Sequence, residues 1–231
     1  MPVPFADRFP WQGAATNCPS DQTSLLGCSV RMLLVLIVGL LACTTSFAQT
    51  AEAYRQKALE FSRDKSWDQA IENYRKALSI EPEDADTHFN LALTLKYKGE
   101  PRAAVEEFQA VVRLRPKWAD AHYGLGATWY DLHDQQAALE ELRTAINLDP
   151  ANAGARRILA RIYLEQSNPA AAATELRQAL KLKPTAEMHY ELGLAEGQLG
   201  NPDAAAARFR RGAASSGLRG GLDKARLLDW H

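Results

Sequence analysis

One spacing dominates this sequence: several residue types recur every 34 positions. Prolines do so at Pro82, Pro116, Pro150 and Pro184. Alanines do so in a second row, at Ala70, Ala104, Ala138 and Ala172. Three further apolar rows share the register, and they begin at Ala77, Leu78 and Ile80. Five parallel rows exclude coincidence, so the chain is expected to stack one structural unit several times.

The residues between the prolines predict two helices in each unit. We number each unit so that its proline is position 32. A core face at positions 4, 7, 8 and 11 has the spacing of an amphipathic helix. Position 8 is always alanine or glycine, and position 24 is always large and apolar. A small residue facing a large one lets two helices pack closely, so each unit should be a helical hairpin.

With these rows the sequence resembles the tetratricopeptide repeat family, whose unit is two antiparallel helices in 34 residues. The resemblance covers residues 51–219, and the fifth unit begins one residue early. It implies an all-α fold, an α-solenoid of about five antiparallel helix pairs wound into a right-handed superhelix. The predicted units are 51–84, 85–118, 119–152, 153–185 and 186–219.

The chain continues past the fifth unit. Residues Ser215 to Gly221 are predicted to break the helix, and Leu222, Ala225 and Leu228 would share one side of a short helix after the break. Because the last unit of a stack leaves apolar surface uncovered, we interpret residues 220–231 as a C-terminal capping helix. The alternative is an unstructured tail.

The first fifty residues have the features of an address for export. Residues Met32 to Cys43 are apolar, Arg31 precedes them, and the small residues Ser46 and Ala48 hold the −3 and −1 positions of a cleavage point after Ala48. This pattern predicts a signal peptide over residues 32–48, because the apolar run is too short to span a membrane. Residues 1–31 are predicted to be a non-native or disordered extension, with translation starting at Met32 or Val30. Alternatively, Cys43 is the lipidated cysteine of a lipoprotein signal.

Composition and motifs argue against other classes of function. The formal net charge of -1 disfavours nucleic-acid binding. All three cysteines lie before residue 44, so the repeats contain no cysteine nucleophile or cysteine-based metal site. Three of the five histidines, His88, His122 and His189, fall at position 4, where we expect them to pack in place of an aromatic residue. No catalytic signature occurs, and the prediction is a non-enzyme without cofactor or metal.

The resemblance also implies a place for ligands. Family members bind peptides on the concave surface, through positions 2, 5, 9, 12 and 13 of the first helices. Aromatic residues with neighbouring cations at these positions would suit a peptide with apolar and acidic side chains. Alternatively, the aromatic residues only cover neighbouring helices. The candidate peptide-binding residues are Arg55, Phe89, Lys96, Tyr97, Tyr123, Tyr130, Arg157, Arg161 and Tyr190.

These observations together predict a scaffold or adaptor that binds a protein partner of unknown identity. The signal sequence places it in the periplasm or cell envelope, with no membrane span in the mature chain and a lipid anchor as an alternative. The rival interpretation is a rigid structural subunit or lipoprotein of an envelope assembly. Such a subunit would dock through its convex face or its ends.

Overall fold

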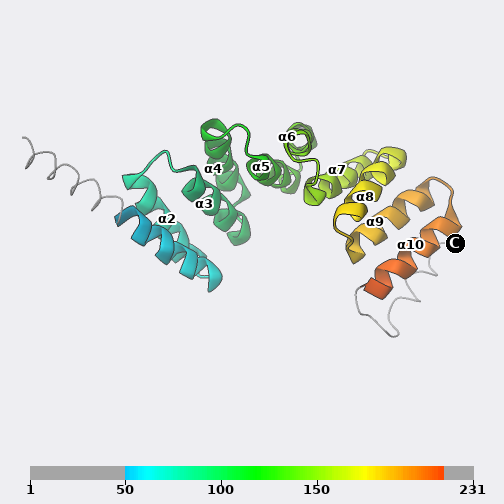
Figure 1. Cartoon of the computed structure of the whole chain (residues 1–231), viewed down its shortest axis with the longest axis horizontal. Helices are drawn as coiled ribbons and strands as arrows, with labels where there is room; N and C mark the ends of the chain where they lie inside the picture. The colour runs from blue at the N-terminus through cyan, green and yellow to red at the C-terminus, as the bar shows by residue number, and fades with distance from the viewer. Residues whose placement is uncertain (1–49, 216–231) are drawn as a thin grey trace, which may run out of the picture. The chain divides into compact units, whose positions relative to one another are not determined.

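The computed structural model describes residues 50–215, and the part of the chain that it describes is helical with no strand (Figure 1). The predicted signal peptide, Cys43 and the predicted C-terminal helix lie outside the described residues. After an unlabelled helix over residues 50–63 come α2 (Trp67–Ile80), α3 (Ala85–Lys98), α4 (Pro101–Leu114), α5 (Ala119–Asp131), α6 (Gln135–Leu148), α7 (Ala153–Glu165), α8 (Pro169–Leu182), α9 (Ala186–Gln198) and α10 (Pro202–Ser215). None of these helices is long and apolar enough to cross a membrane.

Helices that follow one another in the chain pack side by side. In units two to five the two helices of a unit form the most extensive contacts, as in α3 with α4 and α5 with α6. Each second helix from α2 to α8 then packs on the next first helix. First helices of successive units also touch, as α5 does with both α3 and α7. The prediction of an all-α array of antiparallel helix pairs is therefore confirmed.

The repeated small and large residues form the core of each pair. Ala104 and Ala138 at position 20 are fully buried, as are Phe108 and Leu142 at position 24. A Cβ added to Gly126, at position 8, would lie 2.9 Å from the Leu142 side chain. The small residue is therefore required for the helices to approach, as the sequence predicted.

The turn inside each unit has one backbone geometry throughout. The residue at position 15 has a positive φ in all five units, at Lys65, Gly99, His133, Ser167 and Gly200. This left-handed residue ends the first helix, and two residues later the second helix begins. Where position 16 is Asp134 or Asn168, its side chain accepts a hydrogen bond from the backbone N–H three residues further on and caps the second helix.

A polar bridge ties the two helices together at one end of three units. In each, the side chain at position 4 binds the glutamate at position 23 and the carbonyl of the preceding proline loop. His122 places Nδ1 2.7 Å from Glu141 and Nε2 2.9 Å from the Pro116 oxygen. Arg156 makes the equivalent contacts with Glu175 and Pro150. The position-4 histidines in these units are therefore hydrogen-bonding residues, and the expectation of simple aromatic-like packing was incomplete.

The fifth unit departs from this bridge. His189 occupies position 4, but Arg208 stands where the other units have glutamate. The Nδ1 atom of His189 is buried and has no hydrogen-bond partner in the described structure. Burial, with Arg208 and Arg211 nearby, lowers the pKa of this histidine. The last unit thus keeps the histidine of the bridge without its acceptor.

Candidate functional site

The first helices of the five units line one face of the array, which we call the first-helix face. Because these helices touch from unit to unit, side chains at positions 2, 5, 9, 12 and 13 of successive units become neighbours. All nine predicted peptide-binding residues belong to this set of positions. The structure separates them into residues used for packing, residues held in ion pairs and residues left exposed.

Arg55 lies in an acidic cluster at the junction of the first two units. Its guanidinium contacts Glu81 at 2.5 Å, Asp84 at 2.9 Å and Glu52 at 2.8 Å. Burial works against its charge, but the hydrogen bonds that it donates to Glu81 and Glu52 raise the pKa of Arg55. The guanidinium is therefore occupied within the chain and is poorly placed to bind a carboxylate from a ligand.

An open groove runs beside Arg55, with a volume of about 760 Å³. We call it the acidic groove, because carboxylates outnumber its one cation. They come from the first helix, from the loop that follows α2 and from α3, namely Glu52, Glu81, Glu83, Asp84 and Asp86. Leu59 adds an exposed apolar side chain to the lining, and Asn90 adds an amide. The groove can therefore contact both cationic and apolar groups.

Two of the predicted binding aromatics are needed for packing. The Phe89 ring stacks on Trp118 at 4.7 Å and meets Phe108 edge-on at 5.7 Å. Tyr123 lies against α7, where a Cβ added to Gly154 would be 2.8 Å from its hydroxyl. Burial also raises the pKa of Tyr123. These two side chains therefore cover neighbouring helices, because the first helices of successive units are close enough to share side chains.

The cations predicted in the fourth unit are joined to a buried glutamate. Arg157 contacts both carboxylate oxygens of Glu191 at 2.9–3.1 Å, so α7 is linked to α9. Arg161 lies 3.9 Å from the same carboxylate, with its guanidinium 5.0 Å from the centre of the Tyr130 ring. Hydrogen bonding to Glu191 raises the pKa of Arg157. This network supports the stacking of units four and five.

Tyr130 is also engaged within the chain. Its hydroxyl donates a hydrogen bond to Glu165 of the next unit. Burial and then this hydrogen bond raise the pKa of Tyr130 to about 12. In the second unit Lys96 reaches Asp131 at 3.1 Å, which joins α3 to the end of α5. These predicted ligand contacts therefore already have partners from neighbouring units.

Tyr97 and Tyr190 are the most accessible of the predicted binding residues. Tyr97 is 71% exposed and Tyr190 is 56% exposed, the two highest values among the exposed large apolar residues of the described chain. The Tyr190 ring leans on Phe209, 5.4 Å away. Exposed aromatic side chains that pack against another aromatic ring are suited to protein contacts.

The sequence interpretation missed Glu191 and the carboxylates of the acidic groove. Glu191 stands 34 residues after Arg157, so one repeat length separates the two partners. Glu83 lies in the loop between units, and no hydrogen bond or ion pair engages its carboxylate within the described residues. Following charges across unit boundaries, and not only along each first helix, would have found both.

The described residues contain no group of three or more His, Cys, Asp or Glu side chains that could hold a metal ion. The histidines at position 4 are instead separated by whole units. The site is therefore a surface of aromatic residues and carboxylates, laid over stacked first helices. It can recognise side chains of another polypeptide.

Helix pairs repeated in this way define an α-solenoid protein. Family models agree: one described as "TPR repeat" matches residues 59–99, and one described as "Tetratricopeptide repeat" matches residues 89–155 and 158–218. The chain belongs to the tetratricopeptide repeat family. A search of curated protein sequences finds no match.

Solved structures of the same fold are similar along most of their length. The crystal structure of a MamA protein is 25% identical, with a TM-score of 0.66, and the match covers 76% of this chain and 98% of that one. MamA from Desulfovibrio magneticus RS-1 is 22% identical, with a TM-score of 0.68 and coverage of 74% and 98%. Pseudomonas aeruginosa pilF is 24% identical, with a TM-score of 0.66 and coverage of 79% and 82%. These similarities confirm the fold.

Proposed function

We propose that this protein is an exported scaffold that binds an extended segment of a partner protein on its first-helix face. Membership of the tetratricopeptide repeat family supports a role in protein–protein interaction. The observation that carries the proposal is the acidic groove, which opens on this face beside the first-helix residues Arg55 and Leu59. A repeat array offers such a surface without a catalytic centre.

The chemistry of the groove favours a positively charged segment. The cations Arg55, Lys96 and Arg157 each form an ion pair with a carboxylate of the chain. The carboxylate of Glu83, in contrast, has no cationic partner within the described residues. A lysine or arginine of the partner would pair with the carboxylates of the groove, and its apolar neighbours would contact Leu59. The ligand expected from sequence carried an acidic group, so the proposal reverses the sign of its charge.

Binding to this face can be tested with a partner protein that is purified from envelope extract by its affinity for the immobilised full chain. Glu83→Lys should weaken binding about ten-fold or more and reduce its salt dependence, because it replaces an attractive charge with a repulsive one. Tyr190→Ala should weaken it less. Calorimetry would give the affinities, and circular dichroism would show that helical content is unchanged.

The matched control is Glu106→Lys, an exposed position on second helix α4. It makes the same charge change away from the first-helix face. If Glu83→Lys binds the partner as tightly as wild type and Glu106→Lys binds it more weakly, the partner contacts the second helices instead. That result would favour the alternative of a rigid structural subunit that docks through its outer face or ends.

Export to the periplasm or envelope is the second part of the proposal. The apolar run from Met32 to Cys43, with Arg31 before it and Ser46 and Ala48 after it, supports cleavage after Ala48. N-terminal sequencing of protein from the envelope should begin at Gln49. A mature start at Met1 or Met32 would contradict the proposal, and a lipid on Cys43 would establish the anchored alternative.

A further inference from the structure

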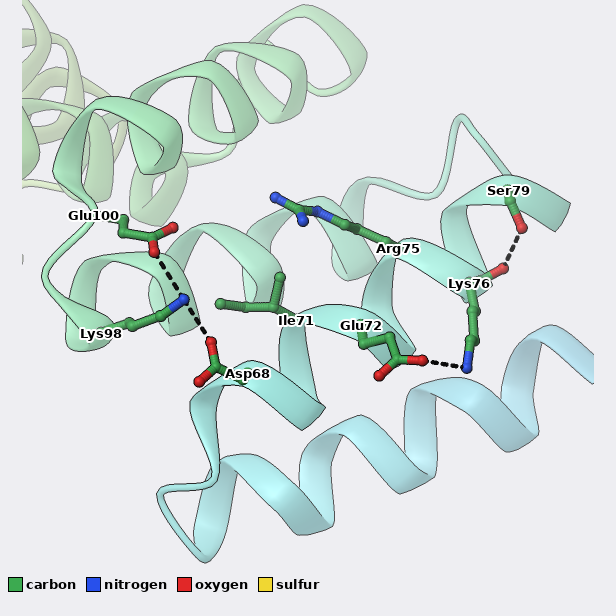
Figure 2. Close-up of a pocket in the computed structure, with 8 residues that line it drawn as sticks. All are labelled: Asp68, Ile71, Glu72, Arg75, Lys76, Ser79, Lys98 and Glu100. Atoms are coloured by element: carbon green, nitrogen blue, oxygen red, sulfur yellow. Dashed lines mark hydrogen bonds and ion pairs between the residues drawn. The ribbon is translucent and has the colours of Figure 1, made fainter.

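A second groove in the first two units lies along α2 (Figure 2). We call it the outer groove. Asp68, Ile71 and Arg75 line it from α2. Lys98 lines it from the end of α3, and Glu100 from the turn between α3 and α4. Its volume is about 470 Å³. None of these residues belongs to the first-helix face.

Most charges in the outer groove are paired within the chain. Lys98 lies 2.5 Å from Asp68 and 2.8 Å from Glu100. Lys76 lies 2.6 Å from Glu72. Figure 2 shows Arg75 extended from α2, with no contact drawn to the other labelled residues. Within residues 50–215, no hydrogen bond or ion pair engages its guanidinium, so it is the cation available to an outside group.

Other units show what an arginine at this position does. Arg75 is at position 25, as are Arg143 and Arg177. The arginines in units three and four reach position 11 of the next first helix, where Arg143 donates to the Tyr163 hydroxyl at 3.3 Å and Arg177 contacts Glu196 at 2.5 Å. The repeated architecture thus directs this side chain toward an acceptor on its neighbour.

The acceptor is missing beside Arg75. Position 11 of the second unit is Leu95, which is 1% exposed and has no polar side-chain atom. Arg75 therefore has the placement of Arg177 without the counterpart of Glu196. An outside carboxylate would supply that group and would form a charge-assisted hydrogen bond with the guanidinium.

An aromatic pair, of which Tyr97 is exposed and Trp67 is partly buried, lies next to the groove. Tyr97 stacks on Trp67 with ring centres 5.9 Å apart and an angle of 20° between the planes. These residues directly precede Lys98 and Asp68, whose ion pair borders the groove. Tryptophan, tyrosine and arginine are the residue types that most often dominate binding energy at protein interfaces. The outer groove therefore has an apolar platform beside a free cation.

We propose that the outer groove and the Trp67–Tyr97 pair form a second docking surface, for a protein segment that places an aspartate or glutamate on Arg75 and an apolar side chain on Tyr97. The one unpaired charge of the outer groove, on Arg75, is opposite in sign to the carboxylates of the acidic groove. One chain can therefore hold two segments of different charge. This property does not depend on which partner occupies the first-helix face.

Selection of a random twelve-residue peptide library on the full chain tests the proposal. One class of enriched peptides should carry Asp or Glu within a few residues of an aromatic or large aliphatic residue. Their affinity should fall about ten-fold with Arg75→Glu and also fall with Tyr97→Ser. Arg113→Glu is the matched control, since Arg113 is exposed on α4 and also has no partner among the described residues.

The variants must retain the circular dichroism spectrum of the wild type, which exposed positions should permit. Peptides that lose affinity with Glu83→Lys but not with Arg75→Glu would report the acidic groove. The proposal is overturned if those are the only class, if acidic peptides bind Arg75→Glu as well as wild type, or if no peptide is enriched.

Discussion

The two ends of the repeat array differ in the side chains that they place where an interior unit has its stacking surface. At the N-terminal end, the helix over residues 50–63 has Ala53, Lys57 and Glu60 at positions 3, 7 and 10, all exposed. The next first helix fills those positions with buried residues, including Leu91. The first unit therefore presents polar side chains where an interior unit presents its stacking surface.

At the C-terminal end, α10 keeps part of the apolar pattern. Its positions 21, 24 and 28 are Ala206, Phe209 and Ala213, and the alanines are exposed. Phe209 is only partly buried, whereas Phe108 at the same position is fully buried. The N-terminal end thus carries charged side chains at its stacking positions. The C-terminal end carries small apolar side chains and one aromatic ring. Stacking faces can be ended by either route, and only the first leaves a polar surface.

Exchange of the position-7 residues should give the largest effect. Leu91→Lys would place an ammonium group at a fully buried position and should cost more than about 4 kcal/mol of unfolding free energy. Lys57→Leu should change stability by less than about 0.5 kcal/mol, because the site is exposed. Urea denaturation would measure both. Similar losses in the two variants would show that the first helix has a covered outer side.

Position 24 offers a second comparison between interior and end. Phe108→Ala should cost about 3–5 kcal/mol, because this ring packs against its own unit and against Gly124 of the next one. Phe209→Ala should cost less than half as much, since its described contacts come from α9 alone. The ratio from denaturant unfolding is the measurement. Equal costs would mean that another segment covers Phe209.

Position 20 should be insensitive to place in the array. Ala104 and Ala205 both pack inside their own helix pair and both are buried. Ala104→Trp and Ala205→Trp should therefore each cost about 1–3 kcal/mol through overpacking. Thermal unfolding of the two variants would test this. A loss of stability in Ala104→Trp alone would show that the helices of the last pair are packed less closely than those of the second unit.

The polar bridge at position 4 should matter only where it is complete. His122→Leu removes two hydrogen bonds and should cost about 1–3 kcal/mol. His122→Arg should recover most of this loss, because Arg156 makes the same contacts in the fourth unit. His189→Leu should be nearly neutral, as its Nδ1 has no partner. Failure of arginine to recover stability would assign His122 a packing role.

The smallest expected effect is a pH dependence at the C-terminal end. Burial lowers the pKa of His189 below its ordinary 6.5, so the unfolded chain binds a proton at higher pH than the folded chain does. Its contribution is therefore complete above about pH 6.5 and declines as the pH falls below that value. His189→Leu should flatten the stability curve between pH 7 and 5. A steeper curve in the variant would contradict this assignment.

The architecture was predictable because it depends on repeated size and polarity. The pairing of small position 8 with large position 24 was correct down to Gly126 and Leu142. The surface was less predictable, because its side chains find partners in other units. Arg157 was expected to be a free cation, but its partner Glu191 stands one repeat later and is separated from it by a whole hairpin.

Some missed features were present in the sequence as spacings. His88 and Glu107, His122 and Glu141, and Arg156 and Glu175 are all 19 residues apart. Glu196, which stands at position 11 of the fifth unit and 19 residues after Arg177, is likewise buried and bonded to that arginine. Although burial alone would raise the pKa of Glu196, the hydrogen bonds that it accepts from Arg177 and Asn201 lower it. Pairwise charge spacing carries information that apolar periodicity does not.

The left-handed residue at position 15 has a consequence for how such an array can change in length. Lys65, His133 and Ser167 adopt there the same conformation as Gly99 and Gly200, although each non-glycine residue pays about 1–2 kcal/mol to do so. The hairpin geometry is thus carried by the backbone and tolerates different side chains. A duplicated stretch of 34 residues would arrive with a compatible turn, whereas one inserted residue in that turn would put its helices out of register. Growth or shortening of the gene by whole units is therefore the permitted change.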